Sequence, residues 1–330
     1  MYSLIKSLMM PLGVSGREAP IREVIEGKIK PYVDDVRTDP MGNLIAHKAP
    51  TAKNPNGKKL MFAAHTDEIG FYVTGVNDEG FVRFSAAGGI RYEWTVPSRV
   101  IFDTGLIGIL IGDDSASSFN ADNCWVDIGA KSKKEAERKV KVGDTFTVEP
   151  TISKLSTSWL TGRPFDDRIG CAILVEAAMR AKTSPYDIYY VFTSQEEIGC
   201  RGSRVAAYEI MPDVAVAVDI TKTGDTPGAL KMGTRLGGGA AIKVKDPSVI
   251  CDPHLVDTMV SICKSEKIPY QLEILTMGGT DTSELQSAGA GRPAGCISIP
   301  TRYAHTPLET IDTGDVEACV RLTTALIEGR

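Results

Sequence analysis

The sequence predicts an α/β protein with a mostly parallel β-sheet flanked by helices, interrupted by a smaller β-rich, barrel-like domain. In residues 1–70 and 161–330, short runs of β-branched and aromatic residues alternate with helical patterns. Strands that alternate with helices usually pair in parallel. Residues 71–160 instead carry closely spaced short strands separated by turns. We therefore expect a discontinuous α/β domain formed by residues 1–70 and 161–330, with residues 71–160 inserted into it.

Composition and charge are those of a soluble globular protein. The 330 residues are 42% hydrophobic and 24% charged, and the net charge is −5 at pH 7. This charge argues against nucleic acid or an anionic membrane as the main partner. The seven cysteines have no C-x-x-C spacing, which indicates reduced thiols rather than disulfides or a zinc site. No stretch resembles a signal peptide or a membrane span, so we expect a cytoplasmic protein.

Two helices and three strands are expected before residue 71. They are helices over residues 1–10 and 17–30, and strands over residues 36–38, 44–47 and 59–64. The last strand is apolar throughout and ends at His65. His47 lies in a polar stretch, which is typical of an exposed strand residue rather than of a metal ligand.

The inserted region is expected to consist mainly of short strands. They cover residues 71–76, 81–84, 100–102, 106–111 and 145–148. Residues 131–141 are dominated by charged side chains, which is typical of a solvated helix. No cluster of metal-binding or nucleophilic residues appears in this region. We therefore expect it to shape access or assembly.

Regular alternation of helices and strands resumes after Gly162. The expected elements are helices over residues 168–181, 205–208, 253–266, 282–288 and 313–327, and strands over residues 188–193, 214–218 and 296–299. Asp252 and Pro253 form a strong helix start, with the aspartate as N-cap and the proline at the first helical position. His254 then lies in the first turn of that helix, where we expect a surface role.

Side chains of the metal-binding type follow four of the predicted strands. They are His65 with Asp67, Glu196 with Glu197, Asp219, and His305 after a short loop, while Asp166 and Asp167 precede the helix at 168. In open α/β sheets, functional residues collect outside the carboxyl ends of the strands. Each residue alone has a simpler explanation, such as a packed histidine, a turn aspartate or a carboxylate that compensates a helix dipole. Their joint placement at one edge favours a shared site.

The donor types predict a pair of zinc or cobalt ions. Borderline divalent metals favour mixed imidazole and carboxylate ligands, and two ions about 3.5–4 Å apart need a bridging carboxylate. The adjacent glutamates Glu196 and Glu197 raise each other's pKa. A cation offsets this cost by holding one of them and leaving the other as a proton acceptor. In the pair His65 and Asp67, the carboxylate can accept the ring N–H that faces away from the metal.

These motifs resemble those of the dinuclear metallo-aminopeptidases of the tetrahedral, self-compartmentalising type, relatives of glutamyl aminopeptidase, some of which carry the name endoglucanase. The resemblance covers nearly the whole chain. It rests on the segments His65–Gly70, Phe165–Gly170, Gln195–Gly199, Val218–Thr221 and Arg302–Pro307, with further support from Asp39–Asn43 and Asp127–Lys131. It implies an enzyme that hydrolyses N-terminal residues from peptides with a water activated by two metal ions.

The resemblance also implies a role for each residue of the site. Asp166 would bridge both ions, with His65 and Asp219 completing one site. Glu197 and His305 would complete the other. The remaining implied features are Glu196 as the general base, Asp67 as the partner of His65, and a cis peptide between Asp166 and Asp167.

A homo-oligomer is implied as well, in which the β-rich domain forms dimers that assemble into a hollow tetrahedral dodecamer. The glycine-rich segments 237–239 and 278–279 lack the spacing of phosphate loops, and they favour close backbone approach at a substrate pocket. Candidate substrate-binding residues are Thr280, Asp281, Thr282 and the loop 234–240. The preferred N-terminal residue is left open.

Three other functions are considered. One is a carboxypeptidase or N-acyl amino acid deacylase on the same fold. Another is a cellulase, which usually needs two metal-free carboxylates at a defined separation. The last is a non-catalytic scaffold that keeps the fold for assembly or binding.

Overall fold

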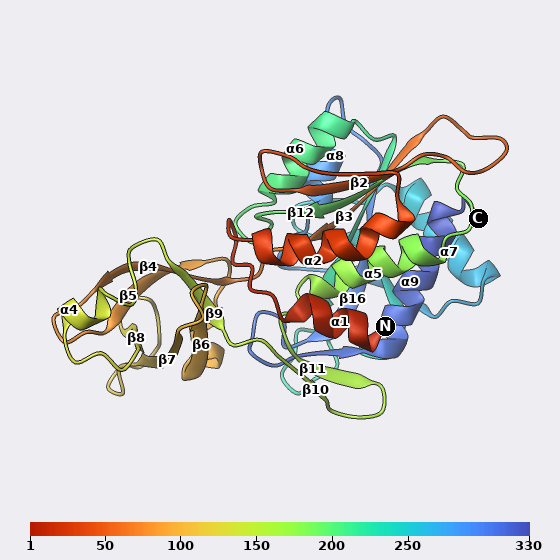
Figure 1. Cartoon of the computed structure of the whole chain (residues 1–330). Coiled ribbons are helices and arrows are strands. Elements are labelled where there is room, and N and C mark those ends of the chain that lie inside the picture. The colour runs from red at the N-terminus through yellow and green to blue at the C-terminus, as the bar shows by residue number, and fades with distance from the viewer.

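The computed structural model describes all 330 residues, which form a helix-covered mixed β-sheet with a closed six-stranded barrel beside it (Figure 1). The fold class expected from the sequence is confirmed. The strands of the sheet, in spatial order, are β1 (Asp35–Thr38), β2 (Leu44–Lys48), β12 (Asp187–Thr193), β3 (Lys59–His65), β13 (Val214–Lys222), β16 (Ala294–Arg302), β17 (Glu309–Asp312), β11 (Trp159–Arg163) and β10 (Thr151–Lys154). Two more strands, β14 (Ala240–Lys245) and β15 (Tyr270–Ile274), extend the sheet from β16.

Four parallel strands, β12, β3, β13 and β16, form the centre of the sheet, and antiparallel strands flank them. The continuous apolar runs of β12 and β3 are buried on both faces, as expected of parallel strands between helices. Thr193 at the end of β12 lies opposite His65. Ala217 of β13 lies opposite Ala63 of β3, which places Asp219 level with His65.

Helices cover both faces of this sheet (Figure 1). One face carries α1 (Tyr2–Met9), α2 (Ala19–Ile29), α5 (Arg168–Arg180), α7 (Pro253–Ser265) and α9 (Thr313–Ile327), and the other carries α6 (Arg201–Ile210) and α8 (Thr282–Gln286). A short 3-10 helix, η1 (Lys30–Tyr32), follows α2. Successive side chains of β3 alternate between the two faces, so Phe62 joins the larger core and Met61 the smaller one.

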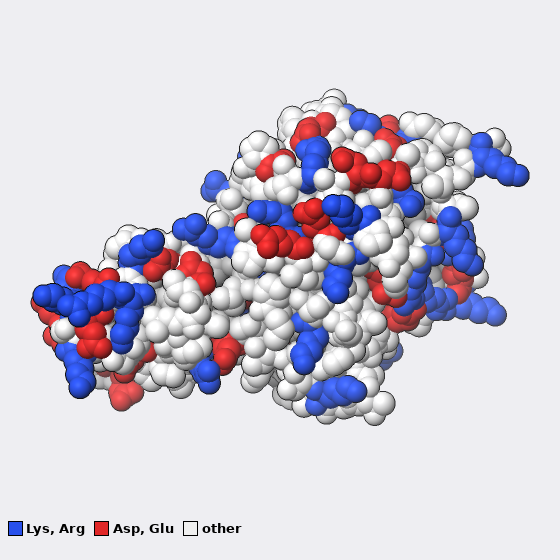
Figure 2. All heavy atoms as spheres, in the orientation of Figure 1, with Lys and Arg blue, Asp and Glu red and all other residues white.

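The barrel has its own core. Its strands, in closed order, are β4 (Gly70–Val76), β5 (Val82–Ala87), β8 (Cys124–Asp127), β7 (Ile107–Gly112), β6 (Ser98–Phe102) and β9 (Thr145–Val148), with the short helices α3 (Tyr92–Thr95) and α4 (Lys133–Ala136). Phe71 and Phe146 stack with ring centroids 4.9 Å apart inside it. Charged side chains gather at the barrel end that carries α4 (Figure 2). Only one helical turn forms there, shorter than the helix expected over residues 131–141.

Several elements differ from the expectations. The strand predicted over residues 214–218 continues to Lys222, because Thr221 and Lys222 still pair with β16. The short strands β8, β10, β11, β14, β15 and β17 were not expected from the pattern. The barrel strands end at Val148, whereas β10 and β11 pair in the large sheet. No helix in the structure is long and apolar enough to span a bilayer.

Candidate metal centre

The predicted polar residues meet at the carboxyl edge of the parallel strands. The cavity there has a volume of about 360 Å³. Its lining includes His65 from the end of β3, Glu196 and Glu197 from the loop after β12, Asp219 from β13, His305 from the loop after β16, and Asp166 from the turn before α5. Residues far apart in the sequence therefore share one cavity, as the strand-end argument predicts.

Asp166 lies between the two histidines. Its Oδ1 is 3.0 Å from Nε2 of His65, and its Oδ2 is 3.1 Å from Nε2 of His305. The peptide between Asp166 and Asp167 is cis, which confirms the expectation stated above. One carboxylate thus faces a different imidazole with each of its oxygens, an arrangement suited to bridging two cations.

Each histidine also has a second carboxylate close by. Nε2 of His65 is 3.8 Å from Oδ1 of Asp219, and Nε2 of His305 is 3.6 Å from Oε2 of Glu197. The cluster therefore divides into two groups of donors that share Asp166. Glu196 lies nearer the first group, with Oε2 3.9 Å from Nε2 of His65.

Burial and mutual repulsion shift the pKa values of these groups strongly. Burial raises the pKa of Glu197 to about 8 and that of Asp219 to about 7, despite the nearby histidines. Burial also raises the pKa of Glu196 well above its ordinary value. For His305, burial lowers the pKa, but Glu197 and Asp166 outweigh it and raise the pKa to about 10. The cluster therefore favours the binding of cations, whether protons or metal ions.

The residues fit divalent metal ions in a further respect. Oε1 of Glu197 is buried and has no hydrogen-bond partner, and such an orphaned carboxylate oxygen is costly unless something binds it. Histidine and carboxylate donors from His65, Asp166 and Glu197 lie within 4.8 Å of one another. Mixed nitrogen and oxygen donors of this kind suit zinc or cobalt.

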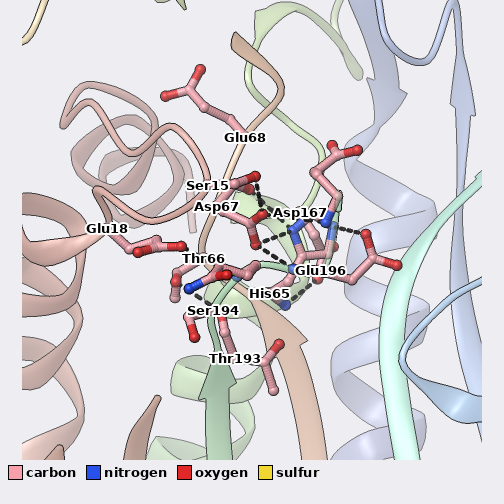
Figure 3. A network of polar contacts seen from close by, with 12 residues as sticks. Ser15, Glu18, His65, Thr66, Asp67, Glu68, Asp167, Thr193, Ser194 and Glu196 are labelled. Atoms are coloured by element: carbon pink, nitrogen blue, oxygen red, sulfur yellow. Dashed lines mark hydrogen bonds and ion pairs between the residues drawn. The ribbon is translucent and has the colours of Figure 1, made fainter. Parts of the chain in front are cut away.

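Asp67 is fully buried behind His65 and connects it to the glutamate loop. Nδ1 of His65 is 3.0 Å from the backbone carbonyl of Asp67 and 3.5 Å from its carboxylate. The carboxylate accepts hydrogen bonds from the backbone N–H groups of Glu196 and Glu197 and from the hydroxyl of Ser15, at 2.9, 3.2 and 2.6 Å. Figure 3 shows Asp67 between Ser15 and Glu196. Its side chain therefore fixes the glutamate loop more directly than it fixes the imidazole.

Two supporting residues were missed by the sequence reasoning. The buried carboxylate of Glu309 accepts hydrogen bonds from the backbone N–H groups of Phe165, Asp166 and His305. The backbone carbonyl of Gly89, from the inserted region, lies 3.0 Å from Nδ1 of His305. Neither residue lies in a motif of metal-binding type, and only the long-range fold brings them to the site.

Asp281 lies close to the cluster, with its carboxylate within 4.8 Å of donor atoms of Glu196 and Cys200, and its Oδ1 has no hydrogen-bond partner. The two histidines expected to have surface roles lie apart from it. His47 pairs with Asp187 at 2.5 Å, and His254 is exposed in the first turn of α7. Thr280 and Asp281 are buried and do not line the cavity, and Asp281 accepts a hydrogen bond from the hydroxyl of Thr193. Gly278 and Gly279 do line it.

The loop 234–240 lies at α9 and not at the cavity. The N–H groups of Gly237 and Gly239 donate to Asp315 of α9 at 2.7 Å each. Thr282, whose hydroxyl is 2.8 Å from that of Thr280, is also buried. Neither the loop nor Thr282 lines the cavity.

Comparisons with known proteins agree with this geometry. The family model described as M42 glutamyl aminopeptidase matches residues 42–322. A putative aminopeptidase of Acetivibrio thermocellus is 42% identical over 98% of this chain and 97% of its own length. The solved aminopeptidase APDkam598 of Desulfurococcus kamchatkensis has a TM-score of 0.95 and 34% identity over 99% of this chain and 94% of its own. The TET1 peptidase of Pyrococcus horikoshii, described as assembling into a tetrahedron or a large octahedral shell, has a TM-score of 0.86 and 31% identity over 100% of this chain and 99% of its own.

Proposed function

Because this chain belongs to the M42 glutamyl aminopeptidase family, a family of metal-dependent peptide hydrolases, we propose that it removes N-terminal residues from peptides by a mechanism that uses two divalent ions and Glu196 as the general base. The observation that carries the proposal is the position of Asp166 between His65 and His305, with one carboxylate oxygen toward each imidazole. A single metal ion would be bound by only one of these two imidazole–carboxylate pairs.

The residues that would hold the ions divide as the contacts divide. Asp166 would serve both ions, His65 and Asp219 the first, and Glu197 and His305 the second. Zinc or cobalt suits this donor set. When bound, the ions supply Lewis acidity to the scissile carbonyl and to the attacking water.

Glu196 is the residue best placed to move protons. It lines the cavity but lies farther from His65 than Asp166 does, and its Oε1 accepts a hydrogen bond from the Cys200 thiol at 3.4 Å. Burial raises its pKa well above the ordinary value, toward the range in which a general base works best. It accepts the proton of the attacking water and returns it to the leaving amine.

The same carboxylates account for cleavage at the chain end. A peptide with a free N-terminus brings an amine that would approach the ions and the carboxylates around them, while an N-blocked peptide brings none. The cavity thereby selects substrates with a free α-amine. This separates the proposed activity from that of a carboxypeptidase or a deacylase.

The domain division expected from the sequence remains part of the proposal. Residues 1–70 and 161–330 form the catalytic domain, and β10 and β11 belong to the same large sheet. The barrel within residues 71–160 makes contacts between subunits. The similarity to a peptidase described as forming a tetrahedron supports a homo-oligomer built from dimers, with a dodecamer as its full form. The mass of the protein in solution tests the proposed oligomeric state.

The decisive experiment compares metal-free protein with protein that has regained zinc, cobalt or manganese. Substrates are free aminoacyl-nitroanilides and peptides, together with their N-blocked forms. The proposal expects hydrolysis that returns with metal and is confined to free amines. Activity on N-blocked substrates would favour a deacylase, and protein that binds no metal would favour a scaffold.

A further inference from the structure

A second cavity of about 280 Å³ adjoins the candidate metal centre. Lys222, Met277 and Ala304 line both cavities, so the second begins where the first ends. One of its walls comes from the inserted region, through Arg91 and Trp94. The other walls come from the large domain.

Two cations line this second cavity without a carboxylate partner. Arg91 stacks on Trp94, with its guanidinium carbon 4.4 Å from the ring centroid. Nζ of Lys222 has the sulfur of Met277 at 3.4 Å, and neither cation forms a salt bridge. No aspartate or glutamate is among the twelve lining residues. In a chain with a net charge of −5, two unpaired cations in one cavity form an unusual positive region.

The two cations are close enough to influence each other. Burial lowers the pKa of Lys222, and the charge of Arg91 lowers it further, while the charge of Asp166 in the first cavity acts in the opposite direction. An anion placed between them would relieve this repulsion and gain charge-assisted hydrogen bonds. The surrounding surface is apolar, because Trp94, Leu230 and Tyr303 are 54%, 41% and 41% exposed. The cavity therefore offers apolar contact together with an anion site.

We propose that this second cavity binds the part of a peptide substrate that lies beyond the scissile bond, with a carboxylate of that part held by Arg91 and Lys222. The proposal rests on the aminopeptidase function proposed above. An extended peptide advances about 3.3 Å per residue. A peptide whose N-terminal residue lies at Asp166 and Glu196 would extend toward the second cavity past the shared residues Lys222, Met277 and Ala304.

The charge of the second cavity orients such a peptide. The carboxylates of the first cavity would be largely offset by the divalent ions they hold. Arg91 and Lys222 in the second cavity attract a carboxylate and repel an amine. A short peptide therefore binds in the productive direction because its two ends carry opposite charges.

The carboxylate can come from the C-terminus of a short peptide or from an acidic side chain. Tripeptides with a free C-terminus are compared with their C-terminal amides, and amidated tripeptides with glutamate at the third position are compared with those with glutamine. The wild-type enzyme is expected to hydrolyse at least one carboxylate form with a higher kcat/KM, mainly through a lower KM. The pair that shows the preference identifies the source of the carboxylate.

The variant Arg91→Gln tests the role of the cation. It is expected to reduce the preference for the carboxylate form by about threefold to tenfold, the effect typical of a charge-assisted contact at a partly exposed site. The matched control is Arg138→Gln, which removes the same charge from an exposed position in the same domain and is expected to keep the wild-type preference.

Two outcomes would overturn the inference. One is a wild-type enzyme that shows no preference for the carboxylate form in either pair of substrates. The other is an Arg91→Gln variant that keeps the full preference, and a smaller mass in solution for that variant would in addition assign this surface to a subunit contact. Amidated tripeptides without an acidic side chain and aminoacyl-nitroanilides lack the carboxylate, so their hydrolysis reports the proposed function separately from this cavity.

Discussion

The carboxylate of Asp67 accepts a 2.9 Å hydrogen bond from the backbone N–H of Glu196. A residue that follows β3 therefore fixes the loop after β12, which carries Glu196 and Glu197. The second oxygen accepts from the N–H of Glu197 and from the hydroxyl of Ser15. The distance between the proton acceptor and the metal donors therefore depends on a buried carboxylate that does not line the cavity.

Replacing Asp67 with asparagine is expected to lower kcat by roughly 10- to 100-fold, as is typical of outer partners at metal sites. An asparagine side chain has one acceptor oxygen instead of two, so one N–H of the glutamate loop loses its partner. The rate is measured at saturating metal. Ser15→Ala keeps the carboxylate and removes one donor, so it should lose only a small part of this activity. Equal losses in both variants would contradict the assigned role.

Glu196→Gln is expected to reduce kcat by roughly 10²–10⁴-fold, the usual contribution of a general base. The metal content per chain should stay at the wild-type level, because Glu196 is not among the proposed ligands. Activity and bound metal are measured on the same preparation. Glu23→Gln, at an exposed position on α2, is the control for the loss of one carboxylate. Substantial turnover by the metal-loaded Glu196→Gln variant would remove this residue from the mechanism.

Asp166→Asn should abolish the binding of both ions, whereas Asp219→Asn should weaken only the ion held with His65. The reason is that Asp166 faces both imidazoles, while Asp219 lies 3.8 Å from Nε2 of His65 alone. Elemental analysis of dialysed protein gives the number of ions per chain. A result in which Asp166→Asn keeps one tightly bound ion would argue against a shared carboxylate.

The metal-free protein is expected to lose stability as the pH rises. Burial raises the pKa of Glu197 from 4.5 to about 8 and that of Asp219 from 3.8 to about 7. The folded state therefore binds more protons than the unfolded chain between these values, and the free energy of unfolding falls as the pH rises through them. For His305, with a pKa of about 10 instead of 6.5, the stabilising contribution is complete below pH 6.5 and is lost toward pH 10.

The melting temperature of chelator-treated protein should accordingly be several degrees lower at about pH 8.5 than at about pH 5.5. Added zinc should raise it most at the higher pH, where fewer protons compete with the metal. Glu197→Gln should show a smaller pH dependence without metal. A melting temperature that rises with pH in the metal-free protein would contradict this account.

Gly89→Ala is expected to weaken the metal site of His305. A Cβ atom there would lie 3.1 Å from Nδ1 of His305, so the imidazole or the loop must move. We expect roughly a 10-fold loss in metal affinity or activity. Gly75→Ala is a matched control, because a Cβ at that barrel position meets no atom within 4 Å. Identical behaviour of the two variants would show that the inserted region does not position the histidine.

The sequence by itself determined the residue types of the site and their placement at one edge of the parallel sheet. Strand periodicity placed His65 and the Glu196–Glu197 pair at the ends of apolar strands, and parallel strands end at one edge of a sheet. These inferences depend on local patterns. Six short strands were missed for the same reason, because strands of four to six residues such as β10 and β15 carry little periodic signal.

Only the tertiary structure decided which atoms meet. The carbonyl of Gly89 reaches His305 across 216 positions of the chain, and Glu309 accepts an N–H from Asp166 across 143. The side chain of Asp67 likewise binds the backbone of Glu196 rather than serving the imidazole of His65 alone. Such contacts depend on the packing of the barrel against the sheet and on the register of its strands. Hydrophobic periodicity encodes the position of an element along the chain, and close packing of distant elements sets the direction of each side chain.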